Sequence, residues 1–293
     1  MTITSDRSAP SRRHLRLVDG CGDDRPLGAP AAADPAAVTG YAGFYGPITG
    51  RLIDPLLDAA GVGEGTRVLD VATGPGCLAA RAAQRGAAVV GVDIDPSMVA
   101  LARRRHPRLD IREADAGALP FAAGSFDAVV GNFLVHHLQS PAAAIAELMR
   151  VLAPGGVLAL TAWDLPARTR FVGVFLEAID DCAATAQDAS PRRDFFRYSA
   201  DPTLAGLLAG QGLREVEVRT TAFAHPVASA SALWDGLLAG TDRSSATRIA
   251  CQPPAVKRRI RASFERRANA YRRGDRLELP VSTKLVRGRQ LAA

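Results

Sequence analysis

The chain has 293 residues, of which 47% are hydrophobic and 23% charged, a composition that is ordinary for a globular protein. It has no uninterrupted apolar run of about 18 residues and no apolar centre of a secretory signal near its start, so we expect no membrane span and a cytoplasmic protein. The formal net charge is +6, yet residues 257–289 hold twelve Lys and Arg against three Asp and Glu, which leaves −3 for the remainder. Because the positive charge is confined to one segment, we interpret it as a solvated helix face, and a nucleic-acid partner is not expected.

Two different segments precede the regular part of the chain. Residues 1–38 are rich in Ala, Pro, Asp, Arg and Gly and show no periodicity, which predicts a disordered arm. From residue 41 to residue 60 the apolar residues recur at helical spacing, and glycines at positions 61 and 63 end the pattern. We therefore expect an N-terminal helix at the start of a core domain that covers residues 39–223.

Short apolar runs and helical segments then alternate. The predicted strands are 67–72, 88–92, 109–113, 126–131 and 156–163, and the predicted helices between them are 78–85, 96–105 and 141–152. Apolar runs that need no alternation, each separated from the next by a helix, are typical of a parallel sheet that is covered on both faces. This pattern predicts an α/β, doubly wound, Rossmann-like sheet.

The second half of the chain follows a different pattern. Helical signals at 171–184 and 202–211 lead to an alternating strand at 214–222, and a last alternating stretch covers 277–287. Between these two strands, residues 224–276 predict a helical insertion, whose apolar stripe lies opposite its arginines. We expect a mostly parallel sheet of seven strands, with the insertion as a lid and residues 277–293 as the last strand and tail.

A glycine loop follows the first predicted strand, in the run VLDVATGPGCLA at residues 68–79. Gly74, Gly76 and Ala79 satisfy the dinucleotide pattern GxGxxG/A, so an NAD-dependent oxidoreductase is a competing interpretation. However, Asp70 stands inside the strand just before the loop, where its carboxylate would repel a pyrophosphate. S-adenosylmethionine has no phosphate and carries an ammonium and a sulfonium group, which a carboxylate attracts.

Two more carboxylates follow the next two strands. Asp93 ends the second strand, 19 residues after Gly74, where it can accept both hydroxyls of a ribose, and Asp115 follows the third strand, where it can accept from an adenine amine. A single Asp at a strand end is more often a helix cap or turn residue than a ligand. Three of them at the carboxyl ends of successive strands favour a binding site.

The order of these motifs resembles a known family. The runs LDVATGPG, GVDIDPSMVALAR, EADAGALPFAAGSFDAVVGNFLVHHL and ELMRVLAPGGVLALTAWD follow one another between residues 41 and 164. Together they resemble the ubiquinone/menaquinone-biosynthesis-like group of class I S-adenosylmethionine-dependent methyltransferases. The resemblance implies S-adenosyl-L-methionine as cofactor and transfer of its methyl group to the O, N or C atom of a small, aromatic or apolar metabolite, which we assign to secondary metabolism.

The resemblance also implies roles for individual residues. The methionine end of the cofactor is assigned to Asp70, Ala72, Thr73, Gly74, Pro75 and Gly76. The ribose and adenine are assigned to Asp93, Ile94, Met98, Asp115 and Ala116. The methyl-donor cavity is assigned to Asn132 and Phe133. In such enzymes the N-terminal helix closes over the cofactor, which implies lid contacts from Tyr41, Tyr45 and Arg51. No metal site is expected, because the four cysteines show no CxxC spacing.

Candidate catalytic residues follow the fourth and fifth strands. A general base is needed only when the acceptor arrives protonated, and the candidates are His137, His136 and Asp164. A His at this point often caps or packs without any catalytic role. A third possibility is that the chain binds S-adenosylmethionine and catalyses a reaction other than methylation.

The insertion is expected to determine the methyl acceptor. Its large apolar residues either roof an apolar pocket or form the insertion's own core, and they include Phe223, Leu233, Trp234, Leu237, Leu238, Phe264 and Tyr271. The first alternative favours an aromatic acceptor, and the second is expected for more than half of these residues. A homodimer formed through this region is possible on the same grounds.

Overall fold

Eight strands form one mixed sheet in the part of the chain that the computed structural model describes, which is residues 43–182, 196–240 and 249–292. These strands are β1 (Arg67–Val71), β2 (Ala88–Asp93), β3 (Asp110–Glu113), β4 (Phe126–Gly131), β5 (Leu152–Trp163), β6 (Arg214–Val227), β7 (Arg272–Arg273) and β8 (Arg276–Arg289). Seven of them run in the order β3-β2-β1-β4-β5-β8-β6, and the two-residue β7 pairs with β8 beside this path. The predicted seven-stranded α/β sheet is therefore confirmed, with β7 as a short addition.

The direction of the strands sets the position of a binding site. The pairs of β1 with β2 and β4, of β2 with β3 and of β4 with β5 are parallel, whereas β8 runs antiparallel to β5 and β6. The chain order reverses at β1, which has β2 on one side and β4 on the other. In open sheets of this type, ligands bind beyond the carboxyl ends of the strands at that reversal.

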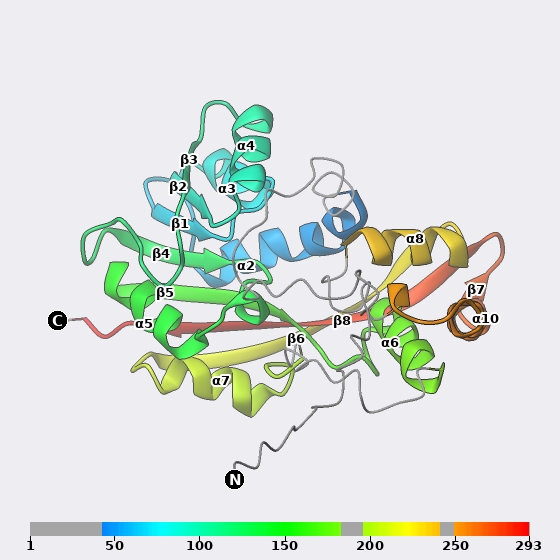
Figure 1. Ribbon diagram of the computed structural model, residues 1–293. Helices are drawn as coiled ribbons and strands as arrows, with labels where there is room; N and C mark the ends of the chain where they lie inside the picture. The colour runs from blue at the N-terminus through cyan, green and yellow to red at the C-terminus, as the bar shows by residue number, and fades with distance from the viewer. Residues whose placement is uncertain (1–42, 183–195, 241–248, 293) are drawn as a thin grey trace, which may run out of the picture.

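Helices cover both faces of the sheet (Figure 1). They are α2 (Ile53–Ala59), α3 (Cys77–Gln84), α4 (Pro96–Arg105), α5 (Pro141–Val151), α6 (Arg170–Cys182), α7 (Asp201–Ala209), α8 (Ala230–Gly240) and α10 (Pro254–Asn269). Successive side chains of β1 point to opposite faces, so Val68 packs in a cluster with Leu56 of α2, whereas Leu69 packs in a cluster with Leu148 of α5 and Leu204 of α7. The first face carries α2 and α3, and the second carries α5 and α7.

The N-terminal helix is present as predicted in the part that is described. Residues 43–49 are helical and continue through a 3-10 turn, η1 (Gly50–Leu52), into α2. Its apolar stripe is buried, as Ile48, Leu52 and Leu56 show. The predicted arm at 1–38 and the predicted lid residue Tyr41 lie outside the described residues.

The insertion starts later than the sequence predicted. Strand β6 does not end at residue 222 but continues to Val227, and its residues 224–227 pair with residues 277–280 of β8. The extension includes Pro226, which a sheet tolerates here because β6 is an edge strand. The helical part of the insertion therefore begins with α8.

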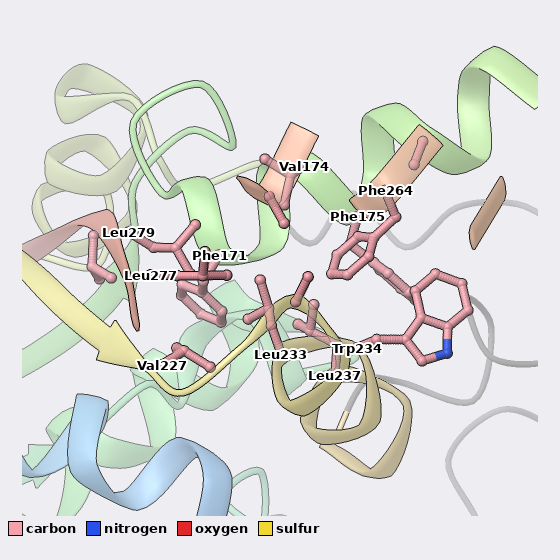
Figure 2. Packing of buried hydrophobic residues seen from close by; sticks show 14 of the residues in the cluster. Phe171, Val174, Phe175, Val227, Leu233, Trp234, Leu237, Phe264, Leu277 and Leu279 are labelled. Carbon is pink, nitrogen blue, oxygen red and sulfur yellow. The ribbon is translucent and has the colours of Figure 1, made fainter. Parts of the chain in front are cut away.

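The apolar residues of the insertion form a core that they share with the rest of the protein (Figure 2). Trp234 of α8 contacts Phe264 of α10 and Phe175 of α6, with ring centroids 5.0 and 5.4 Å apart. Leu233 and Leu237 are buried in the same cluster, and Phe223, Leu238 and Tyr271 are partly buried against it. These residues therefore form a core, as the second of the two alternatives from the sequence expected. The difference is that α6 and the N-terminal helix also contribute to this core.

Replacing Gly236 by Ala tests the contact between the insertion and the N-terminal helix. A Cβ atom at Gly236 in α8 would lie 2.0 Å from Cδ2 of Phe44, so the substitution forces the ring or the helix to move. We expect Gly236→Ala to lower the free energy of unfolding by about 1–3 kcal/mol, as overpacking does. The matched control is Gly206→Ala in α7, where a Cβ meets nothing within 4 Å and Ala favours the helix. Urea unfolding of both variants measures the difference, and equal stabilities would contradict this packing.

Candidate active site

The glycine loop leaves the end of β1 in a conformation that side chains rarely adopt. Ala72, Gly74 and Gly76 have φ angles of +57°, +54° and +83°, and the backbone N–H of Thr73 donates to Val92 O of β2 at 2.9 Å. A Cβ at Gly76 would lie 2.9 Å from Cδ2 of His106, so this glycine allows close packing at the start of α3. At Gly74 a Cβ would meet nothing within 4 Å, which leaves the loop open toward a ligand.

Asp70 is a buried carboxylate directly beneath this loop. Its side chain is 1% exposed, and its Oδ2 accepts a hydrogen bond of 2.6 Å from Oγ1 of Thr73. Its Oδ1 is buried and has no hydrogen-bond partner among the described residues. Burial raises the pKa of Asp70 to about 7, although the hydroxyl of Thr73 and the backbone N–H of Ala79 oppose this shift. A buried oxygen without a partner is rare, and a cationic ligand group would satisfy it.

Asp93 joins the end of β2 to the glycine loop. Its Oδ2 accepts from the backbone N–H of Gly74 at 2.8 Å, and its Oδ1 accepts from that of Asp95 at 2.9 Å. Burial raises the pKa of Asp93, while these backbone donors oppose the shift. Each carboxylate oxygen keeps a lone pair for a further donor, so the group can accept two hydroxyls.

An exposed apolar surface lies next to Asp93. The side chain of Ile94 is 48% exposed, one of few large apolar side chains that the described part of the chain exposes, and Met98 in the first turn of α4 is half-buried. A flat aromatic ring such as adenine would cover such a surface. Asp115 is exposed and its Oδ1 accepts from the backbone N–H of Gly117 at 2.8 Å, as in a turn, while Ala116 is half-buried.

Asn132 and Phe133 follow β4 and are held by a residue that the sequence analysis missed. Thr161 of β5 donates through Oγ1 to Oδ1 of Asn132 at 2.7 Å and accepts there from the backbone N–H of Phe133 at 2.8 Å. The amide of Asn132 in turn donates to Thr49 O of the N-terminal helix at 3.1 Å. Phe133 has a φ of +59°, which is strained for a bulky residue. The sequence signal that could have identified Thr161 is that it is the single hydroxyl residue within the apolar run of β5.

An aromatic cluster fills the space beyond Phe133. The rings of Phe133 and Trp163 are stacked, with centroids 4.0 Å apart and an interplanar angle of 30°. Phe171 of α6 meets Trp163 edge-on at 5.4 Å, and Tyr45 of the N-terminal helix lies 6.3 Å from Trp163. These side chains are buried, so they close this end of the site against water.

Arg51 extends from the N-terminal helical segment toward β6. Its guanidinium stacks over the ring of Phe223 in β6, with Cζ 4.8 Å from the ring centroid, and it lines a groove with His225. No hydrogen bond joins it to the glycine loop among the described residues. The lid contact of Arg51 with the cofactor therefore stays a prediction.

The two histidines after β4 differ in their environment. Both belong to the turn η2 (Val135–His137), where His136 is buried and His137 is exposed. The ring of His136 lies 6.4 Å from that of Phe133, and burial holds the pKa of His136 well below its usual value. His136 is therefore neutral at pH 7 and has the protonation state that a base requires.

Asp164 belongs to a buried ion network on the other face of the sheet. Its Oδ2 accepts from Oγ of Ser282 at 2.7 Å and lies 3.7 Å from Nζ of Lys284, which pairs with Asp201 of α7 at 2.7 Å. Although burial opposes ionisation, these partners lower the pKa of Asp164, which makes it a weak base. The catalytic prediction for Asp164 is corrected accordingly: it follows Trp163 in the chain and points the opposite way.

The requirements of a membrane-spanning helix and of a metal site are not met by the described residues. Over the described ranges, no helix combines the length and the apolar character needed to cross a lipid bilayer. In the same part of the chain, no group of three His, Cys, Asp or Glu side chains is arranged to bind a metal ion.

Sequence comparisons find similarity to methyltransferases over part of the chain. A family model described as a methyltransferase domain matches residues 69–160. A demethylmenaquinone methyltransferase of Renibacterium salmoninarum is 40% identical over 122 residues, which are 42% of this chain and 52% of that protein. A demethylmenaquinone methyltransferase of Thermus thermophilus is 46% identical over 111 residues, 36% of this chain and 50% of the relative. The chain thus spans about half the length of these curated relatives.

Solved structures share the fold at low sequence identity. The YcgJ protein of Bacillus subtilis superposes with a TM-score of 0.53 and 17% identity, over 83% of this chain and all (100%) of that one. Phosphoethanolamine N-methyltransferase 2 of Haemonchus contortus, solved with S-adenosyl-L-methionine, gives a TM-score of 0.55 at 18% identity, over 88% of this chain and 57% of the other. The Rossmann-like methyltransferase fold predicted from the sequence is confirmed by these superpositions.

Proposed function

We propose that this chain, which by its matched domain is a class I S-adenosylmethionine-dependent methyltransferase, transfers a methyl group to a small aromatic or apolar metabolite. The cofactor of this domain family is S-adenosyl-L-methionine. The observation that carries the proposal is the unpartnered Oδ1 of Asp70, buried beneath a loop that is open at Gly74. A pyrophosphate would be repelled there, so the nicotinamide interpretation is disfavoured.

The residues of the site divide the binding of the cofactor among themselves. Asp70 pairs with the ammonium group, Asp93 accepts the ribose hydroxyls, and Ile94 covers the adenine together with Met98 and Ala116. When bound, S-adenosylmethionine supplies a methyl group that its sulfonium already activates. What the protein adds is alignment of the acceptor and exclusion of water.

The aromatic cluster serves the second of these tasks. Phe133 and Trp163 stand at the ends of β4 and β5, and Tyr45 and Phe171 close over them from the N-terminal helix and α6. Thr161 fixes the backbone of Phe133, so this wall is rigid on the side of the sheet. An acceptor with an aromatic or apolar body fits such a wall.

The choice of base depends on the acceptor. An acceptor that arrives protonated needs a base near the end of β4. The ring of the neutral and buried His136 lies 6.4 Å from that of Phe133, whereas His137 is exposed. We retain both histidines as candidates and favour His136 for its place beside Phe133; its lowered pKa keeps it unprotonated at neutral pH but also makes it a weaker base.

A product assay tests the proposed reaction. Purified protein is incubated with S-adenosylmethionine and a panel of phenols, quinols and aromatic amines, and the mixture is analysed by mass spectrometry. We expect S-adenosylhomocysteine to form in equal amount to an acceptor that has gained one methyl group. An acceptor converted without any S-adenosylhomocysteine would contradict methyl transfer and favour a different reaction on the same cofactor site.

A further inference from the structure

A groove lies between the N-terminal helix and the end of β6, and no residue of the glycine loop lines it. It has a volume of about 370 Å³, and its lining comes from residues 43–51 on one side and from residues 225–232 on the other. Phe44, Pro47 and Val227 make much of this lining apolar, whereas Arg51 and His225 add polar groups. A space of this size holds a small aromatic molecule.

The charge of Arg51 is not neutralised within the described residues. The two acidic residues that follow it in the N-terminal helical segment are used by α3: Asp54 pairs with Arg81 and Arg85, and Asp58 pairs with Arg85. Among the residues that the structure describes, no carboxylate lies within ion-pair distance of Arg51. Within the described ranges, the guanidinium in the groove thus has no acidic partner, and it lies next to an apolar wall.

The guanidinium also lies over an aromatic ring. Its Cζ is 4.8 Å from the ring centroid of Phe223. A cation–π contact of this kind does not use the N–H donors of the guanidinium, which stay available to an anion. A carboxylate is the planar anion that such a group binds through two parallel hydrogen bonds.

His225 adds a second polar group to the same groove. Its side chain is largely buried at the end of β6, and neither ring nitrogen takes part in a hydrogen bond with another described residue. Burial and the nearby charge of Arg51 lower the pKa of His225, so the imidazole is neutral and can both donate and accept.

One residue of the groove packs against the aromatic cluster beside Phe133. Phe44 lines the groove and meets Tyr45 edge-on, with ring centroids 5.1 Å apart, and it lies 6.3 Å from Phe171. Both of these neighbours surround Trp163. A molecule seated in the groove would therefore contact Phe44, which packs on the rings that surround Trp163.

We propose that this groove binds the methyl acceptor by a carboxylate, which Arg51 holds while the apolar body lies against Phe44 and Val227. The substrate class is then an aromatic or otherwise apolar carboxylic acid. This inference rests on the proposed function, since it names the acceptor of that reaction. It assigns Arg51 to the acceptor, whereas the resemblance implied a lid contact with the cofactor.

Binding of a simple probe tests the proposal. Wild-type protein saturated with S-adenosylhomocysteine is titrated calorimetrically with 1-naphthoate and with its uncharged amide, 1-naphthamide. We expect the carboxylate to bind about tenfold more tightly than the amide, and Arg51→Gln to remove this preference. Arg51→Lys keeps the charge without the planar fork, so we expect it to restore only part of the affinity.

Control variants and the cofactor separate the possible outcomes. Arg258→Gln removes the same charge from the exposed face of α10 and is expected to change neither ligand. Naphthoate that fails to bind, binds no better than the amide, or binds equally to Arg51→Gln overturns the proposal. A loss of S-adenosylhomocysteine binding in Arg51→Gln also overturns it and returns Arg51 to the cofactor. Failure of wild-type protein to bind S-adenosylhomocysteine would instead contradict the proposed function.

Discussion

Replacing Asp93 by Ala is expected to weaken the binding of S-adenosylmethionine at least about 100-fold, which corresponds to about 2.7 kcal/mol. The carboxylate is placed to accept two ribose hydroxyls, and hydrogen bonds to a charged acceptor contribute about 1.5–3 kcal/mol each. The substitution also removes the acceptor of the Gly74 N–H, so the glycine loop loses its tie to β2. Isothermal titration calorimetry measures the affinity directly.

A matched variant separates this effect from general damage to the sheet. Asp110→Ala removes a carboxylate from the neighbouring strand β3, where it is exposed and pairs with Arg112. We expect its affinity for the cofactor to equal that of the wild type. An Asp93→Ala protein that folds and binds within threefold of the control would show that Asp93 is only a turn residue.

Asp70 is expected to make cofactor binding depend on pH. Because burial raises its pKa to about 7, the carboxyl is mostly protonated at pH 6, and the ammonium of the ligand must displace that proton. The dissociation constant of S-adenosylmethionine is therefore expected to be about tenfold higher at pH 6 than at pH 7.5. Asp70→Asn should bind weakly at both values, without the pH dependence.

A ligand without the ammonium group is the control for this pH effect. Methylthioadenosine keeps the adenine and ribose but lacks the amino-acid end, so its binding should depend on Asp93 and not on Asp70. If methylthioadenosine showed the same loss at pH 6, another group would be responsible for the pH dependence. Affinities that are equal at both pH values for S-adenosylmethionine would contradict the raised pKa of Asp70.

The carboxyl of Asp70 makes the stability of the free protein fall as the pH rises, whereas it makes the affinity for the cofactor rise. An Asp whose pKa is about 3.8 when unfolded and about 7 when folded loses its proton more easily in the unfolded chain. The stability that the raised pKa of Asp70 contributes to the folded state is therefore fully present below pH 4 and is lost as the pH rises to 7. Asp70→Asn is expected to be more stable than the wild type at pH 8 without ligand, as thermal unfolding would show. A variant that gains stability while it loses the cofactor identifies Asp70 as a binding residue.

The parallel part of the fold could be predicted from the sequence for a clear physical reason. Strands buried on both faces are short apolar runs, and glycine at positive φ marks the turn after β1, so this part of the chain carries strong local signals. Asp70 and Asp93 could be placed near the loop because the carboxyl ends of parallel strands share one edge of the sheet.

Properties that depend on which way a side chain points were harder to predict. Asp164 follows Trp163 immediately, so the alternation of a strand places it on the face of α7, in contact with Ser282 and Lys284. No local signal distinguishes a strand-end carboxylate that faces a ligand from one that faces a buried lysine 120 residues later. Arg51 is a similar case, since its partner Phe223 comes from a distant strand.

The start of the insertion was predicted wrongly because β6 is an edge strand of the sheet. An edge strand such as β6 is exposed along much of its length, so its apolar pattern is weak, and Pro226 suggests an end where pairing in fact continues. The core that α6, α8 and α10 form is an outcome of packing between segments far apart in the sequence. Helical periodicity alone predicts that these faces are buried but not what covers them.

The central claim is that the glycine loop and its carboxylates bind S-adenosylmethionine. Calorimetric titration of the wild-type protein with S-adenosylmethionine, S-adenosylhomocysteine and NADPH tests it most directly. We predict micromolar binding of the first two ligands and none of the third, because the buried Asp70 attracts a cation and repels a pyrophosphate. Binding of NADPH without binding of either S-adenosyl compound would contradict the account and assign the loop to a dinucleotide.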